Sequence, residues 1–186
     1  MIDKKWLKNY LELYNNTIID EGAINNLADF KELIFEAKSN GNKIIFVGNG
    51  GSAAISSHCA VDMTKNAGIR AVNFNEADLI TCFANDYGYE NWVVKALEFY
   101  SNKGDLVVLI SSSGSSQNMV NAAKVAKQLK LKIITFTGFD KKNPLNRLGD
   151  LNFWVNSRAY NVIEMTHHIW ILSVVDLIIG SAEYPA

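Results

Sequence analysis

Residues 106–118 read LVVLISSSGSSQN, and this stretch decides how the chain folds. It begins with five consecutive apolar residues, Leu106 to Ile110, which run directly into a turn of serines and one glycine. An unbroken apolar run is typical of a strand buried on both faces, as in a parallel sheet. The serines and the glycine predict a tight turn into a helix.

The same pattern recurs along the chain. Further apolar runs predict strands at 44–47, 71–74, 133–137 and 151–155, and helical segments are expected at about 52–66, 87–101, 116–129 and 161–179. Two more helices are predicted between residues 3 and 38. Alternating strands and helices indicate a doubly wound α/β sheet. Such sheets bind ligands beyond the carboxyl ends of their strands, so we expect the rim of a site at 48–52, 111–116 and 137–138.

Composition narrows the class of protein. The chain has 186 residues, 48% of them hydrophobic, which predicts one packed domain. The net charge is −1 without a basic stripe, so no nucleic-acid partner is expected. Cys59 and Cys82 lie in apolar stretches and are predicted to be buried thiols in a reducing compartment. The N-terminus lacks a signal-peptide pattern and the apolar stretch 169–180 contains an Asp, so we expect a cytoplasmic protein without a membrane span.

Two turns have the composition of anion sites. In Gly48-Asn49-Gly50-Gly51-Ser52, the glycines let backbone N–H groups approach an anion at a helix start. An ordinary strand-to-helix turn would explain this motif equally well. The turn 111–116 carries five hydroxyls, more than capping a helix requires, and suits a phosphate monoester.

All three histidines lie on the two helices expected to flank these turns. His58 and Asp62 are spaced i, i+4, and Glu164 and His168 repeat that spacing, so each pair shares a helix face. On facing helices, His58, Asp62, Glu164 and His168 would form a four-ligand site suited to zinc. The alternative for each pair is a surface contact worth a few tenths of a kcal/mol.

Three motifs together resemble a known family. GNGGSAA at 48–54, NDYGYEN at 85–91 and the serine turn followed by Asn118 are similar to the phosphoheptose isomerases, within the sugar isomerase (SIS) domain superfamily. The resemblance covers nearly the whole chain. It implies a single SIS domain over 1–186 with a flavodoxin-like parallel sheet, a homotetramer that uses the helices of 1–40 for packing, and active sites at subunit interfaces.

The resemblance also implies an activity and its residues. The family is expected to convert sedoheptulose 7-phosphate, a phosphorylated seven-carbon sugar, into D-glycero-heptose 7-phosphate through an enediol, in the nucleotide-heptose pathway that feeds lipopolysaccharide or capsule. By this resemblance the phosphate lies against Ser111, Ser112, Ser113 and Ser116. The expected sugar-binding residues are Asn49, Gly50, Gly51, Ser52 and Asp86.

The chain departs from the family pattern at three positions, one of which is Glu164, where the family has Gln. Asp62 stands where the family has Glu, and Leu172 stands where it has a histidine proposed to act as acid or base. His168 lies one turn nearer the helix start, on the face of Glu164. We therefore expect Asp62, Glu164 and His168 to transfer the proton. Loss of the distal histidine leaves a second hypothesis open, a non-catalytic SIS module that binds phosphosugars or assembles with other proteins.

Overall fold

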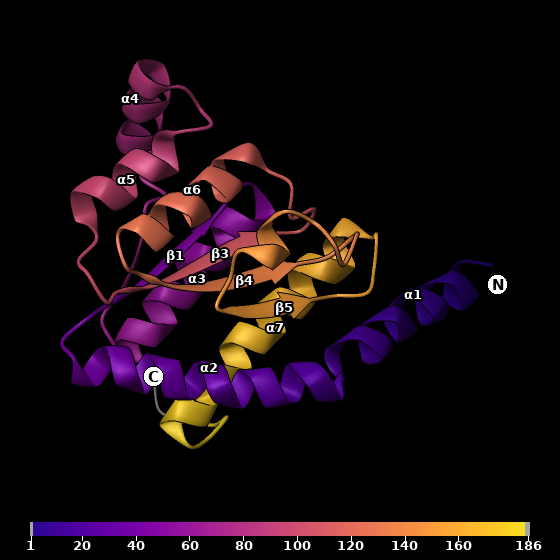
Figure 1. Ribbon diagram of the computed structural model, residues 1–186. Helices are drawn as coiled ribbons and strands as arrows, with labels where there is room; N and C mark the ends of the chain where they lie inside the picture. Colours follow the sequence, from indigo (N-terminus) through magenta and orange to yellow (C-terminus); the bar gives the residue numbers. More distant parts are fainter. Residues whose placement is uncertain (1, 185–186) are drawn as a thin grey trace.

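The computed structural model describes residues 2–184, which form a five-stranded parallel sheet between two layers of helices (Figure 1). The strands are β1 (Ile44–Gly48), β2 (Ala71–Asn73), β3 (Leu106–Ser111), β4 (Lys132–Thr137) and β5 (Leu151–Trp154). Their order is β2-β1-β3-β4-β5, which is the flavodoxin-like order. All five strands agree with the sequence prediction to within about one residue.

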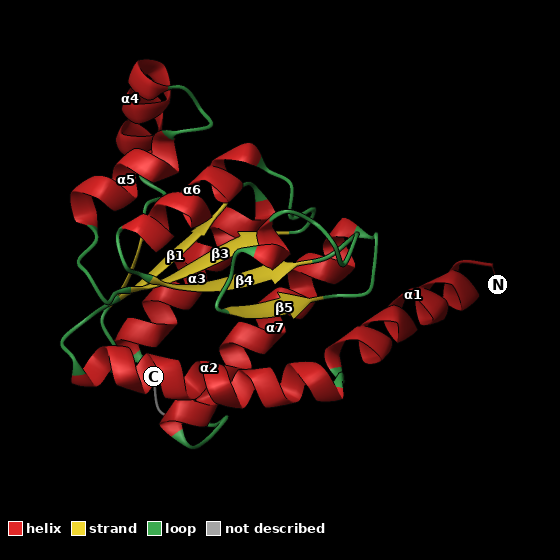
Figure 2. Cartoon of the chain, viewed as in Figure 1, coloured by secondary structure: helices red, strands yellow, loops and turns green. Residues whose placement is uncertain are grey.

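The helices cover both faces of the sheet, as Figure 2 shows in red and yellow. Their bounds are α1 (Ile2–Ile18), α2 (Glu21–Ser39), α3 (Gly51–Lys65), α4 (Ala77–Tyr87), α5 (Trp92–Tyr100), α6 (Gln117–Gln128) and α7 (Tyr160–Ile179), with a 3₁₀ turn, η1, at Leu145–Arg147. One apolar core joins α2, α3 and α7 to the sheet, and a second joins α5 and α6 to its other face. Because both faces are covered, β1 and β3 are buried at every position.

The fold corrects two sequence predictions. The single helix expected at 87–101 is α5 alone, and a separate helix, α4, precedes it and ends at Gly88, whose φ of 84° does not suit a helix. Asp78 lies in the first turn of α4. Cys82 was wrongly predicted to be buried: no residue of α4 is fully buried, and Cys82 lies on its exposed side.

Helix α7 carries Glu164 and His168, two of the predicted acid–base residues, and is also the most apolar helix. It is long and apolar enough to cross a membrane by length and composition, but 44% of its most apolar window is buried within the molecule. Its buried side chains, Trp170 and Ile171 among them, pack in the core with α2 and α3.

Candidate functional site

The serine turn and the glycine turn meet at the carboxyl ends of β1 and β3. These strands are paired in register up to Gly48 and Ile110, so the chain segments that follow them lie side by side. A cavity of about 130 Å³ opens between them. It is lined by Asn49, Ser52, Ile110, Ser111, Ser112, Ser113, Ser116, Tyr160 and Glu164.

The serines present hydroxyls to this cavity at the start of α6. Ser116 is the N-terminal cap residue of α6, so backbone N–H groups without helical partners lie beside it. Ser111 Oγ donates to Ser116 Oγ at 3.3 Å. Ser112 is buried and its hydroxyl has no hydrogen-bond partner among the described residues. A buried hydroxyl without a partner is costly, which favours a ligand that accepts from it.

Asn49 is held in one orientation by Asn118 and Tyr89, neither of which was predicted as a site residue. Its amide exchanges two hydrogen bonds with the buried amide of Asn118, at 3.0 and 2.9 Å, and Tyr89 donates its hydroxyl to Asn49 Oδ1 at 3.2 Å. Both lie within motifs that carry the family resemblance, which is the signal that would have found them. Asn49 thus faces the cavity with one N–H still free to donate.

Glu164 is the one carboxylate in the cavity lining. Its side chain extends from α7 over the start of α3, where a Cβ atom at Gly51 would collide with the carboxylate. Glycine at this position therefore makes room for Glu164. Burial raises the pKa of Glu164 above its ordinary value. A carboxyl group with a raised pKa, beside hydroxyl donors, is suited to accept and return a proton.

His58, Asp62 and His168 form a hydrogen-bonded chain further along the contact between α3 and α7. His58 Nε2 lies 3.3 Å from Asp62 Oδ2, and His58 Nδ1 lies 2.9 Å from His168 Nε2. A carboxylate only accepts, so Asp62 fixes the proton of a neutral His58 on Nε2. His58 Nδ1 then accepts from His168, which leaves His168 Nδ1 as the unprotonated, basic nitrogen.

The surroundings of His168 oppose its protonation. Burial lowers the pKa of His168, the neighbouring His58 lowers it further, and Asp62 acts in the opposite direction. The third histidine, His167, lies in the core, where its Nε2 donates to the carbonyl oxygen of Thr137 at 3.0 Å. His167 is thus a structural residue.

The predicted zinc ligands do not surround one point. Glu164 lies at the cavity, whereas both ring nitrogens of His58 are already used by Asp62 and His168. Within residues 2–184 no three His, Cys, Asp or Glu side chains are grouped to hold a metal ion. The two i, i+4 pairs do converge, as expected, but as a hydrogen-bonded chain beside a separate carboxylate. The donors therefore do not fit a four-ligand metal site.

The remaining predicted residues, Gly50, Gly51 and Asp86, are exposed and do not line the cavity. Gly50 has a φ of 55° and caps α3, and Gly51 is the first residue of that helix. Asp86 lies on the exposed side of α4, where its carboxylate accepts from Asn85 Nδ2 at 2.8 Å. Within this chain Asp86 does not line the cavity.

The sequence is similar to one domain family and to curated phosphoheptose isomerases. The family model described as SIS domain matches residues 6–138. A phosphoheptose isomerase from Aliarcobacter butzleri is 37% identical over 142 residues, which are 73% of this chain and 75% of the relative. One from Buchnera aphidicola is 31% identical over 180 residues, or 94% and 89% of the two chains.

Solved structures agree with these relatives. A phosphoheptose isomerase from Neisseria gonorrhoeae superposes with a TM-score of 0.83 at 26% identity and covers 96% of this chain and 98% of its own. One from Francisella tularensis gives a TM-score of 0.86 with the same coverage, and at 24% identity it supports the fold alone.

Proposed function

The chain belongs to the phosphoheptose isomerases of the SIS domain family, and from that premise we propose that it converts sedoheptulose 7-phosphate into D-glycero-heptose 7-phosphate through an enediol. One observation carries the mechanism. A single cavity holds hydroxyl donors suited to a phosphate and, in Glu164, a carboxyl group suited to move a proton.

The serine turn would hold the phosphoryl end of the sugar. Ser111, Ser112, Ser113 and Ser116 offer hydroxyls, and the first N–H groups of α6 point to the same place. Ser112 contributes most in this proposal, because its buried hydroxyl has no partner within the described chain. Asn49, held by Asn118 and Tyr89, would orient the sugar hydroxyls together with Ser52 and the backbone of Gly50 and Gly51.

Glu164 would act at the reacting carbons. Isomerisation removes a proton from C1 of the ketose to form the enediol and returns a proton to C2, while a second proton passes from one oxygen to the other. Glu164 would take and return the carbon-bound proton. His168 lies one helical turn along α7, about 5.4 Å further, and its Nδ1 would serve the oxygens, with Asp62 and His58 fixing its tautomer.

Zinc stays a prediction of the sequence alone. Because the side-chain donors do not fit a metal centre, no step of this mechanism passes through a metal ion. Elemental analysis of the purified protein after dialysis tests the prediction. One zinc per chain would require the α3–α7 contact to rearrange.

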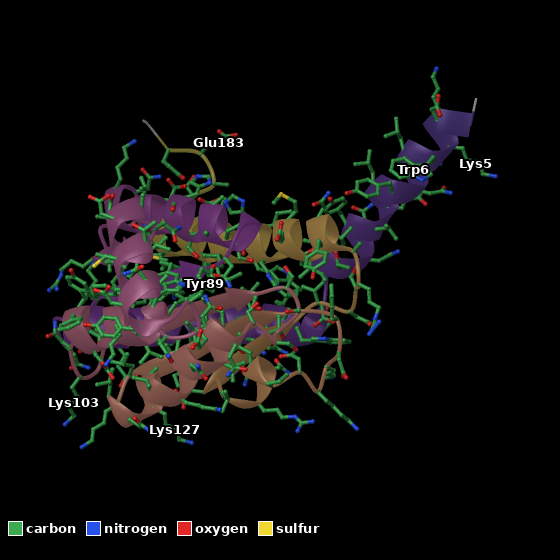
Figure 3. The ribbon with its side chains drawn as sticks, turned by 90° about the horizontal axis from the view of Figure 1, so that it is seen from above. Lys5, Trp6, Tyr89, Lys103, Lys127 and Glu183 are labelled. Carbon is green, nitrogen blue, oxygen red and sulfur yellow. The ribbon has the colours of Figure 1, made fainter. Side chains whose placement is uncertain are left out.

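We also propose the setting in which the enzyme works. It would be a cytoplasmic homotetramer that supplies nucleotide-heptose synthesis for lipopolysaccharide or capsule. The apolar side of α1 supports oligomer packing: Trp6, Leu7 and Leu11 are each more than half exposed. Figure 3 shows Trp6 on α1, at the end that extends away from the body of the molecule.

The test of the proposed function is direct conversion. The purified protein is mixed with sedoheptulose 7-phosphate in deuterium oxide, and proton NMR follows the growth of the C1 proton signal of the aldose and the loss of proton signal at C1 of the ketose and C2 of the aldose as deuterium enters. We expect the aldose signal to grow, and Ser112→Ala to slow conversion mainly through a higher KM. Binding of the ketose without any aldose formed would instead favour a non-catalytic sugar-binding module.

A further inference from the structure

The described residues that line the cavity include no lysine or arginine. They supply hydroxyls and amides, which are neutral, and one carboxylate, Glu164. A phosphate dianion placed in this partly buried space would be repelled by a charged Glu164 and attracted only by dipoles. If the site takes a phosphorylated sugar, as the proposed function requires, a cation near the rim would correct this imbalance of charge.

The loop after β4 places an aromatic ring at this rim. Gly138 N donates to Ser112 O at 2.9 Å, which ties the loop to the serine turn, and Phe139 N donates to Ser157 O at 2.9 Å. Phe139 has a φ of 55°, a left-handed conformation that is uncommon for a bulky residue and is often found at functional sites. Its ring meets the ring of Tyr160 edge to face, with centroids 4.9 Å apart, and Tyr160 lines the cavity.

Arg158 lies on the same ring. Its guanidinium carbon is 6.0 Å from the centroid of Phe139, and the side chain is exposed. No ion pair or hydrogen bond engages this guanidinium within residues 2–184. An arginine resting on an aromatic face keeps its charge free, and its planar donors match phosphate geometry. A free guanidinium therefore lies one aromatic ring away from a wall of the cavity.

We propose that Arg158 is the residue by which this site selects a dianionic phosphate. Phe139 holds the arginine at the cavity rim, and the guanidinium extends past Tyr160 to donate to phosphate oxygens that face away from the serines. The other two arginines differ in their surroundings. Arg70 donates to Gly41 O at the edge where the strands begin, and Arg147 lies on η1 without an aromatic contact.

Inorganic phosphate is the probe that tests this role, with binding measured by titration calorimetry. Arg158→Gln should weaken phosphate binding about tenfold or more, and Arg158→Lys should recover part of the loss because it keeps the charge but not the planar donors. Arg70→Gln, which removes the same charge at the opposite edge of the sheet, should change the affinity less than twofold. In turnover of sedoheptulose 7-phosphate, Arg158→Gln should raise KM far more than it lowers kcat.

The salt dependence gives a second readout. Phosphate binding by the native protein should weaken with added NaCl more steeply than binding by Arg158→Gln, because the variant has lost a charge contact. Phosphate affinity and salt dependence unchanged in Arg158→Gln, with normal turnover, would overturn the role of Arg158 alone. Phosphate binding that depends on Arg158 in a protein without isomerase activity would support the role of Arg158 and contradict the proposed function.

Discussion

At the scale of single residues, the site depends on where Glu164 lies. It occupies the cavity because glycine at position 51 leaves room for its carboxylate, and burial there raises its pKa. Asp62, the other candidate carboxylate, contacts His58 and does not line the cavity. The two carboxylates therefore have different tasks in the proposed mechanism, proton transfer for Glu164 and orientation of a histidine for Asp62.

This division predicts the effect of Glu164→Gln. The amide keeps the size of the side chain but does not exchange a proton, so kcat should fall by roughly 10²–10⁴-fold. Affinity for inorganic phosphate should stay the same or increase, because a negative charge has left the cavity. Steady-state kinetics and calorimetry measure the two effects. A variant with more than a tenth of the native kcat would remove Glu164 from the mechanism.

His167 predicts how stability depends on pH. Burial lowers the pKa of His167 from its ordinary value of 6.5 to about 4, with the Thr137 carbonyl acting in the opposite direction. As pH falls from 6.5 to 4, His167 therefore binds a proton in the unfolded chain but stays neutral in the folded chain. The stability contributed by neutral His167 is complete above pH 6.5 and is lost across this window, up to roughly 3 kcal/mol.

Urea unfolding at several pH values measures this contribution. His167→Gln retains a donor for Thr137 O but does not titrate, so its free energy of unfolding should fall less between pH 6.5 and 4.5 than that of the native protein. Parallel curves for the two proteins would show that His167 is not the residue responsible.

The sequence places Asn49 and Ser111 beside one another because both follow predicted strands, whereas residues 137–138, also expected at the rim, do not line the cavity. Ser111 and Asn49 lie where they do because β1 and β3 are neighbours in register, and apolar runs reveal both strands. The pairing of His58 with His168 depends on how α3 packs on α7. Spacing within one helix shows which residues share a face, but it does not show which atoms meet across two helices. For this reason the sequence predicted one four-ligand zinc site, whereas in the structure His58, Asp62 and His168 form a hydrogen-bonded chain and Glu164 lies apart from them at the cavity.

At the scale of elements, an ion pair joins β1 and β3 at the end of the sheet where the strands begin, opposite the cavity. Lys43 and Asp105 precede β1 and β3, and their side chains form a buried ion pair with Lys43 Nζ 2.5 Å from Asp105 Oδ2. Asp105 also accepts from the backbone N–H groups of Lys43 and Asn102 and from the side chain of Asn42. Burial alone would raise the pKa of Asp105, but these donors together lower it.

Removing this acceptor should destabilise the whole sheet. Asp105→Ala leaves Lys43 and two backbone donors unpaired in a buried place, at a cost of about 3–5 kcal/mol. Asp29→Ala, on the exposed side of α2, is the matched control and should change stability by less than about 0.5 kcal/mol. Chemical denaturation compares the two variants. Equal midpoints for both would show that the ion pair does not stabilise the sheet.

Helix α4 shows what the sequence reading missed at this scale. Its apolar residues Leu79, Ile80 and Phe83 follow a helical spacing, and they pack against the core beneath α5. The helix has no fully buried residue, so its apolar signal is short and interrupted by polar positions. The sequence pattern therefore predicts no helix between the strand at 71–74 and residue 87, whereas α4 begins at Ala77.

At the scale of the whole molecule, α1 carries large apolar side chains that are exposed in the single chain. It contacts the body through α7, where Thr17 shares a hydrogen bond of 2.9 Å with Thr166, while its other end extends outward (Figure 1). Trp6 stacks on Tyr10 with both rings on this extended part. An exposed apolar helix of this kind is typical of a surface that packs against another chain.

The exposed apolar side chains of α1 predict which substitutions should dissociate the proposed tetramer. Trp6→Glu combined with Leu11→Glu places charges on the exposed side of α1 and should convert the tetramer into smaller species. Light scattering coupled to size-exclusion chromatography measures the mass, and circular dichroism confirms that the fold is kept. Lys8→Glu, which changes charge on the same helix without touching an apolar side chain, is the control. A native protein that elutes as a monomer would contradict the tetramer itself.

The central claim is that one cavity binds the phosphate at the serine turn and places the reacting carbons near Glu164 and His168. A crystal structure of the Glu164→Gln variant, frozen soon after it is mixed with sedoheptulose 7-phosphate, tests it most directly, since the variant should bind the sugar and convert it only slowly. We predict the phosphoryl group within hydrogen-bond distance of Ser112 and Ser116, and C1 and C2 beside residue 164. A sugar bound in the reverse direction, or with its phosphate away from the serine turn, would contradict the account.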